Sequence, residues 1–340
     1  MKGIIGKIKG MFPVTVANAV YIDRTSKTLA DAMNEGVLGK IGESQIIKDN
    51  IYVDYIWQPV TVPRPSHDCT VIGNDIVSFD KADDGGAIKY YDIDTFVSGA
   101  SKTHNFIESN GIKLQMKSCD YKYGKLLVGN GRAAYDPDFG RLYVFYDANT
   151  WKANSEIGTS SNMLTFENCG EYKEIDVTSL GGKSYGFWGN GDDIVFVSCN
   201  LFNDVYRIQL ARGDTQWEGG TYTEGTASNR YNGTWTILNH WHQDGALGTF
   251  AAHGGQYYGG HLYLATNDAS KCVVYKCIFK DNGTLEFQPL NFDTRQTNSA
   301  DIIRRYIDGM CIHNGKLYAQ PLNANSGIST RGYIVADIPV

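Results

Sequence analysis

The chain has 340 residues, of which 38 are glycine, 22 tyrosine and 14 phenylalanine, whereas charged residues make up only 20%. This composition is typical of an all-β protein with many tight turns and argues against a helical enzyme. The formal net charge of −6 is mild and spread along the chain, so we do not expect a nucleic-acid groove. No apolar run approaches the ~18 residues of a membrane-spanning helix, so membrane insertion is not expected.

Residues 12 to 23 predict a strand that is covered on both sides. The apolar side chains of one face are Val14, Val16, Val20 and Ile22, and those of the other face are Ala17, Ala19 and Tyr21. The residues before this strand begin with basic side chains but lack the apolar run and the cleavage site of a secretory signal. We interpret them as an interface peptide.

A single short helix is predicted after this strand. Thr28 and Asp31 fit a capping box, and Leu29 and Met33 share one helical face. A helix of about two turns is marginal in water unless its apolar face packs against a partner. Residues 1–45 are therefore predicted to dock on the rest of this chain, on other copies of it or on a larger assembly. The alternative is that they form the first strand and helix of a domain.

The cysteines favour buried free thiols over a disulfide framework or a zinc site. They are odd in number, scattered and without a Cys-x-x-Cys pair. The seven are Cys69, Cys119, Cys169, Cys199, Cys272, Cys277 and Cys311. Unpaired thiols fit a chain that is assembled in a reducing cytoplasm.

From about residue 67 a unit recurs that consists of a strand, a turn rich in Gly, Asn or Asp, and a second strand. Its five copies lie at residues 71–77, 135–143, 188–195, 257–263 and 312–318. A third strand follows in several copies, at residues 87–94, 204–210, 271–279 and 332–338. This recurrence predicts that residues 67–340 form a β-propeller, with five blades favoured and six possible. A β-sandwich and a β-helix are the alternatives.

Residues 46–66 are expected to connect the first segment to the propeller. Residues 50–57 alternate in the manner of a strand that could close the ring. Pro59, Pro63 and Pro65 make the remainder a semi-rigid connector.

Catalytic motifs are scarce. A glycine-rich phosphate loop, a nucleophile elbow and a His-Glu-x-x-His helix are all missing from the sequence, so no cofactor is expected and the chain is interpreted as a non-enzyme. Propeller glycosidases flank the sugar with two acids. The candidate acids here, however, all lie in turn sequences, where Asp satisfies the backbone; they are Asp83, Asp84, Asp136, Asp138, Asp192, Asp193 and Asp268.

The densest cluster of functional side chains lies at residues 235–244. His240 and His242 would share one strand face, as two metal ligands do. Ordinary packing or surface polarity is the favoured interpretation, so no metal is predicted.

Large aromatic residues concentrate in the middle of the chain. Their flat apolar rings with one polar group suit sugars and protein partners alike. The predicted ligand-binding residues are Tyr185, Trp188, Trp217, Tyr231, Trp235 and Trp241. The alternative is that these rings fill the space between blades.

Residues 12 to 38 resemble the attachment segments at the N-termini of tailed-bacteriophage fibre and appendage proteins. The likeness rests on Phe-Pro-Val-Thr-Val-Ala-Asn-Ala-Val-Tyr-Ile-Asp followed by Thr-Ser-Lys-Thr-Leu-Ala-Asp-Ala-Met-Asn. Arg24 stands where glycine is commoner in such segments. The resemblance implies that residues 1–45 attach the chain to a virion or hold copies of it together.

The leading hypothesis is therefore a virion structural protein, a head or tail fibre that is assembled in the host bacterial cytoplasm. Its expected partners are other capsid or tail proteins, further copies of itself as a trimer or other homo-oligomer, and a host-surface glycan or protein. The alternatives are a propeller glycoside hydrolase with two acids in its central funnel and a capsid decoration protein without a ligand.

Overall fold

The chain divides into two units, Met1–Gln45 and Ile46–Val340, and every residue described below belongs to the second. The predicted docking residues, from Val14 to Met33, lie outside the described part. The computed structural model describes residues 51–60, 68–79, 88–97, 116–130, 140–145, 172–182, 185–199, 203–211, 234–243, 252–266, 272–292, 305–323 and 332–339.

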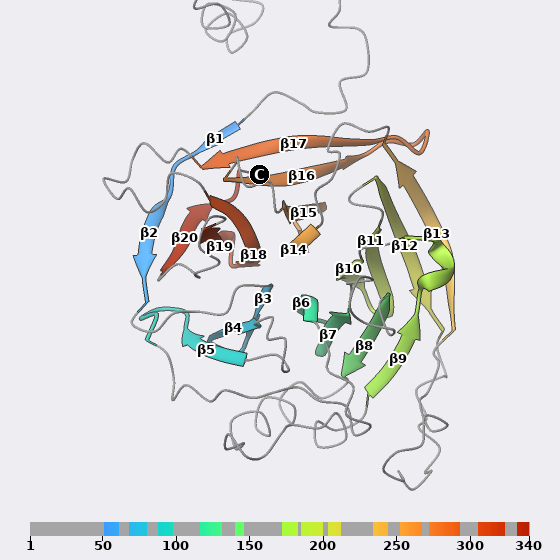
Figure 1. Cartoon of the computed structure of the whole chain (residues 1–340), viewed down its shortest axis with the longest axis horizontal. Coiled ribbons are helices and arrows are strands. Elements are labelled where there is room, and N and C mark those ends of the chain that lie inside the picture. Colours follow the sequence, from blue (N-terminus) through green and yellow to red (C-terminus); the bar gives the residue numbers. More distant parts are fainter. Residues whose placement is uncertain are drawn as a thin grey trace, which may run out of the picture. The chain divides into compact units, whose positions relative to one another are not determined.

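The described residues form five mainly antiparallel β-sheets arranged around a common axis, so the predicted five-bladed propeller is confirmed (Figure 1). Blade I comprises β3 (Cys69–Ile72), β4 (Asp75–Phe79) and β5 (Ile88–Asp92). Blade II comprises β6 (Met116–Lys122), β7 (Lys125–Asn130), β8 (Arg141–Phe145) and β9 (Tyr172–Asp176), followed by a 3₁₀ turn at Thr178–Leu180. Blade III comprises β10 (Gly186–Gly191), β11 (Ile194–Cys199), β12 (Asp204–Leu210) and β13 (Trp235–His242).

The last two blades each include a strand from the start of the described chain. Blade IV comprises β14 (Ala252–Tyr258), β15 (His261–Thr266), β16 (Val273–Phe279) and β17 (Leu285–Phe292), with β1 (Ile51–Val53) added in parallel to β17. Blade V comprises β18 (Arg305–His313), β19 (Lys316–Asn323) and β20 (Gly332–Asp337), with β2 (Ile56–Pro59) antiparallel to β20. Strand β2 thus joins the beginning of the propeller to its last blade.

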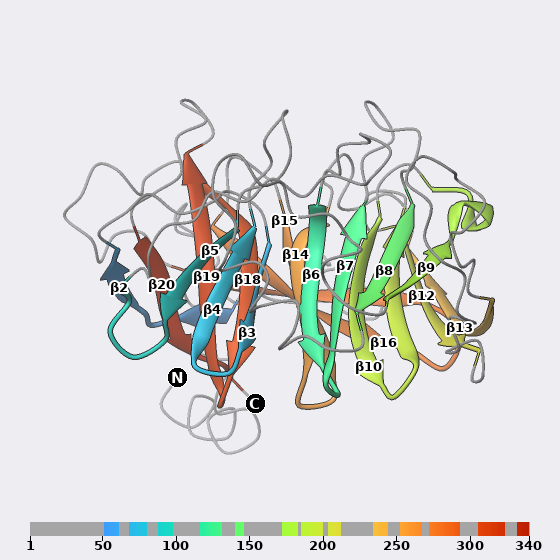
Figure 2. The ribbon, with the colours of Figure 1, turned by 90° about the horizontal axis from the view of Figure 1, so that it is seen from below.

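Tight turns connect the two innermost strands of each blade, and Figure 2 shows them along one edge of the ring. In the β18–β19 turn, Asn314 and Gly315 both have positive φ, at 49° and 78°, as a type I′ hairpin requires. In blade II the corresponding turn is Tyr123-Gly124, where the φ of Tyr123 is 54°. From the sequence, this copy was predicted at residues 135–143 instead, because a tyrosine at positive φ lacks the usual turn signature.

Apolar side chains fill the space between neighbouring blades. One cluster joins blades II and III around Phe187 and Val197, and another joins blades III and IV around Trp188 and Phe287. Six of the seven cysteines lie in the described part, and all six are buried free thiols, as predicted. No helix among the described residues is long and apolar enough to cross a membrane.

Candidate functional site

The innermost strand of every blade lies at an edge of its sheet. The backbone groups on its free side, away from the rest of the blade, therefore have no partner strand in that sheet. Side chains from neighbouring blades supply the acceptors. Just before β3, Asp68 accepts hydrogen bonds from the backbone N–H of Cys69 at 2.9 Å, of Cys119 at 3.0 Å and of Met310 at 3.3 Å. One carboxylate therefore joins blades I, II and V.

The same arrangement recurs around the axis. Thr70 accepts from the N–H of Tyr121 at 2.8 Å, Ser118 from that of Phe187 at 3.0 Å, and Asp120 from that of Gly189 at 2.8 Å. Gln256 then donates to Asp120 and accepts from the N–H of Ile312. These side chains, here called the axial network, are Asp68, Thr70, Ser118, Asp120 and Gln256, and they connect all five blades.

Burial controls the charge of the two axial carboxyl groups, since Asp68 and Asp120 are each only 1% exposed. Burial raises the pKa of Asp68 well above its ordinary value, although three backbone hydrogen bonds oppose the shift. Burial likewise raises the pKa of Asp120 to about 7, against the attraction of Lys122 and the hydrogen bond from Gly189. Both groups are engaged in holding the backbone and are shielded from solvent.

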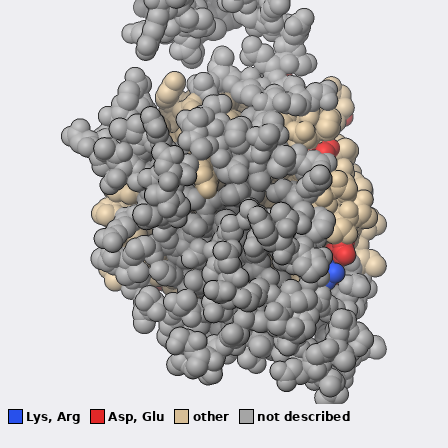
Figure 3. All heavy atoms as spheres, in the orientation of Figure 1, with Lys and Arg blue, Asp and Glu red and all other residues tan. Residues whose placement is uncertain are grey.

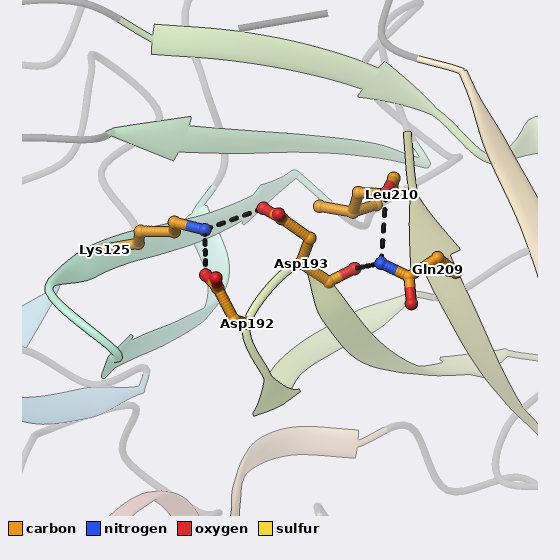
Figure 4. Close-up of polar contacts among 5 residues, drawn as sticks. All are labelled: Lys125, Asp192, Asp193, Gln209 and Leu210. Atoms are coloured by element: carbon orange, nitrogen blue, oxygen red, sulfur yellow. Dashed lines mark hydrogen bonds and ion pairs between the residues drawn. The ribbon is translucent and has the colours of Figure 1, made fainter. Parts of the chain in front are cut away.

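One of the candidate acid pairs, Asp192 and Asp193, lies in the β10–β11 turn and holds a lysine of the neighbouring blade II (Figure 4). The Nζ atom of Lys125 lies 2.6 Å from Asp192 Oδ1 and 2.7 Å from Asp193 Oδ1. Burial lowers the pKa of Lys125, but the hydrogen bonds to both carboxylates outweigh it, and the pKa lies above its ordinary value. The carbonyl of Asp193 also accepts from the Gln209 amide at 3.0 Å. The two carboxylates thus tie blades II and III together, whereas the sequence led us to expect that they satisfy the backbone of their own turn. The remaining candidate acids, from Asp83 to Asp138 and Asp268, lie outside the described residues.

Two of the predicted ligand-binding aromatic residues prove to be core residues. Tyr185 is 1% exposed and Trp188 is 0% exposed, so the prediction that they contact a ligand is wrong. Tyr185 packs between blades II and III, and its hydroxyl accepts from the N–H of Gly182 at 2.7 Å. Trp188 packs between blades III and IV. Inter-blade packing needs large rings, and these two residues serve it.

Trp235 and Trp241 on β13 are half-buried at the outer edge of blade III. The indole N–H of Trp235 donates to the carbonyl of Asp176 at 2.8 Å, and that of Trp241 donates to the carbonyl of Lys280 at 3.2 Å. Each therefore ties β13 to a neighbouring blade and keeps only part of its ring on the surface. Trp217 and Tyr231, the other two predicted ligand-binding residues, lie outside the described part.

The end of β13 brings both predicted histidines to a carboxylate that the sequence analysis did not identify. In the register of β12 and β13, Asp204 is paired with His242 and Tyr206 with His240, so these four side chains share one face. Asp204 Oδ1 lies 2.8 Å from His240 Nε2 and 2.9 Å from His242 Nδ1. We call Asp204, His240 and His242 the rim triad.

The rim triad combines a shielded acid with two accessible imidazoles. The side chain of Asp204 is 11% exposed, whereas those of His240 and His242 are 42% and 49% exposed. The ring of Tyr206 stacks on His240 with centroids 4.2 Å apart and planes 3° apart. Burial and the charge of Asp204 raise the pKa of Tyr206 to about 12, so this phenol is neutral at neutral pH. Asp204 was missed because strand register cannot be derived from sequence spacing.

Charged groups are sparse on the visible described surface. In the face drawn in Figure 3, this surface is mainly uncharged, with a few acidic and basic residues toward one edge. This agrees with the low charge content of the chain and shows no broad basic stripe among the described residues in that view.

Comparison with known proteins finds no matching protein family and no matching curated sequence. Among solved structures, glutaminyl cyclase from Myxococcus xanthus aligns with 87% of this chain and 100% of its own length, at 7% identity and a TM-score of 0.47. An exo-β-1,3-galactanase from Phanerochaete chrysosporium aligns over 83% and 64%, at 8% identity and 0.46. The Cps50 (Swd1) β-propeller domain from Myceliophteria thermophila aligns over 84% and 100%, at 9% identity and 0.40. At these identities the likeness concerns the fold alone.

Proposed function

We propose that this chain is a structural protein of a tailed-bacteriophage particle. Residues 1–45 attach it to other virion proteins or to further copies of itself, and the propeller is displayed as a binding head for a host-surface glycan or protein. The attachment role rests on the resemblance of residues 12–38 to phage appendage segments. The six buried free thiols are compatible with assembly in the bacterial cytoplasm.

The observation that favours binding over catalysis is that the axial carboxyl groups accept hydrogen bonds from the protein backbone. A propeller glycosidase needs two acids that reach the sugar from opposite sides. Asp68 and Asp120 instead accept hydrogen bonds from the backbone of neighbouring blades and are shielded from solvent. Asp68 and Asp120 thus have a structural task.

Several copies per particle are part of this proposal. Weak single sites that are held together gain avidity when a multivalent surface such as a bacterial polysaccharide is engaged. Analytical ultracentrifugation of the full chain measures the copy number, with a trimer or another closed oligomer expected. A monomer at micromolar concentration would restrict self-association to the particle.

Binding and hydrolysis are separated by one experiment. The full chain is incubated with intact host cells and purified surface polysaccharides, and both bound protein and released reducing ends are measured. The proposal predicts saturable binding without reducing ends. Reducing ends that disappear in D120N would establish the hydrolase instead, and an absence of binding to cells and glycans would leave the decoration role.

A further inference from the structure

We propose that the rim triad, formed by Asp204, His240 and His242, is a binding site for one Zn²⁺ ion. This inference is independent of the proposed display function. It concerns the outer edge of blade III, where the last residues of β13 lie beside the first residue of β12.

The donor atoms lie close together, at separations slightly shorter than those of a coordinated set. Zn²⁺ binds imidazole nitrogen and carboxylate oxygen at about 2.0–2.2 Å, so two ligand atoms of one ion lie roughly 3.0–3.5 Å apart. Asp204 Oδ1 is 2.8 Å from His240 Nε2 and 2.9 Å from His242 Nδ1. One atom from each of the three side chains lies within 4.8 Å of the other two. Small side-chain rotations therefore suffice to place an ion between them.

The donor chemistry selects the class of ion. Two imidazoles and one carboxylate suit zinc and the late first-row transition metals, whereas Ca²⁺ and Mg²⁺ require mainly oxygen ligands. Three protein ligands leave a coordination position of zinc open to water or to an oxygen of a bound molecule. Because the imidazoles of His240 and His242 are about half exposed, this position faces solvent.

The surrounding contacts orient the ligands in advance. The ring of Tyr206 lies parallel to that of His240 at 4.2 Å and restricts its rotation. The backbone N–H of His242 donates to the carbonyl of Gly283 at 2.9 Å, which fixes the end of β13 against blade IV. Trp241, between the two histidines in sequence, anchors the opposite face through Lys280. Ligands on supported strands hold a site more reliably than ligands on loops.

A plain hydrogen-bonded clip is the competing interpretation of these contacts. In that case Asp204 would only tie β13 to β12 through the two histidines, and zinc would not bind at this edge. The zinc site predicts that the folded protein binds zinc saturably and that this binding depends on each of the two imidazoles. The clip predicts no such binding.

The test is isothermal titration of the metal-free full chain with zinc chloride, with calcium chloride as a second titrant. The variants are H240A and H242A, and H313A is the matched control because His313 lies on β18, in a different blade. Thermal unfolding of each protein without metal shows that it is folded. Titrations stay well below the unfolding temperature, because the thiols of an unfolded chain would themselves bind zinc.

The expected result is one equivalent of zinc bound by the wild type and by H313A, no calcium binding, and weaker zinc binding in both rim variants. Removing even a hydrogen-bonded partner of a ligand lowers metal affinity by ~10–100-fold, so removing a ligand should cost at least this much. Zinc should also raise the melting temperature of the wild type more than that of either rim variant. No saturable binding by the folded wild type, or binding by H240A and H242A that is as tight as that of the wild type, would overturn the proposal.

Discussion

Asp120 makes the stability of the propeller depend on pH in a direction opposite to that of most carboxylates. Its pKa is about 7 in the folded chain and 3.8 in the reference state. Between these values the folded state keeps a proton that the unfolded state has released. The free energy of unfolding therefore falls as the pH rises from about 4 to 7, and this contribution is constant above that range.

The magnitude follows from the pKa difference. About three units at 1.36 kcal/mol per unit amount to roughly 4 kcal/mol. The substitution D120N removes the titrating group while keeping an acceptor for the N–H of Gly189. It also turns an amide toward the donating amide of Gln256, which costs roughly 1 kcal/mol of hydrogen bonding. D120N should therefore be slightly less stable than the wild type at pH 4 and more stable at pH 8.

The assay is urea unfolding followed by tryptophan fluorescence at intervals from pH 4 to pH 8. The stability difference between D120N and the wild type should change by about 4 kcal/mol across this range. D281N is the control, because Asp281 is exposed in the β16–β17 turn. A difference that stays constant with pH to within ~1 kcal/mol would refute the reasoning, since the axial carboxyl would then titrate alike in both states.

Three further substitutions test the packing and the turns. In G129A the new Cβ would lie 2.3 Å from Ser118 Oγ, so urea unfolding should show that the free energy of unfolding falls by about 1–3 kcal/mol. G191A is the control: its Cβ would make ordinary contacts of 3.4 Å or more, so its free energy of unfolding should change little. In G332A the Cβ would lie 2.4 Å from Trp57 Cζ2, so hydrogen exchange should increase in β2, and unchanged protection would contradict the role of β2 in blade V. The pKa of Asp92 is lowered, mainly by the backbone hydrogen bond from Thr95. D92N should therefore be less stable than the wild type at pH 7, but not at a pH below the folded pKa, where the wild-type group is itself protonated. An equal loss of stability at both pH values would refute this.

Local signals in the sequence were sufficient for several of the strands and for most of the inner turns. Asn314-Gly315 is a type I′ turn in sequence and in structure, and alternation located strands such as β12 and β16. Tyr123-Gly124 was missed because a tyrosine at positive φ is rare and requires support from the surrounding hairpin. A turn can therefore be predicted from sequence where it has its usual residues.

Contacts between distant parts of the chain could not be predicted. The hydrogen bonds of Asp68 reach Cys119 and Met310, which are 51 and 242 residues away in sequence. Asp204 meets His240 across 36 residues because of strand register. Periodicity shows which residues share a face of one strand, but it does not show which strands face one another across a ring.

Incorporation into phage particles tests the proposed role of the chain most directly. Particles are produced with the full chain and with residues 46–340 alone, and the protein content of the purified particles is measured by mass spectrometry. Circular dichroism of the shorter chain checks that its propeller is folded. Attachment through the N-terminal segment predicts that the full chain is present in the particles and that the shorter chain is missing. Equal incorporation of the shorter chain, or particles that lack the full chain, would contradict it.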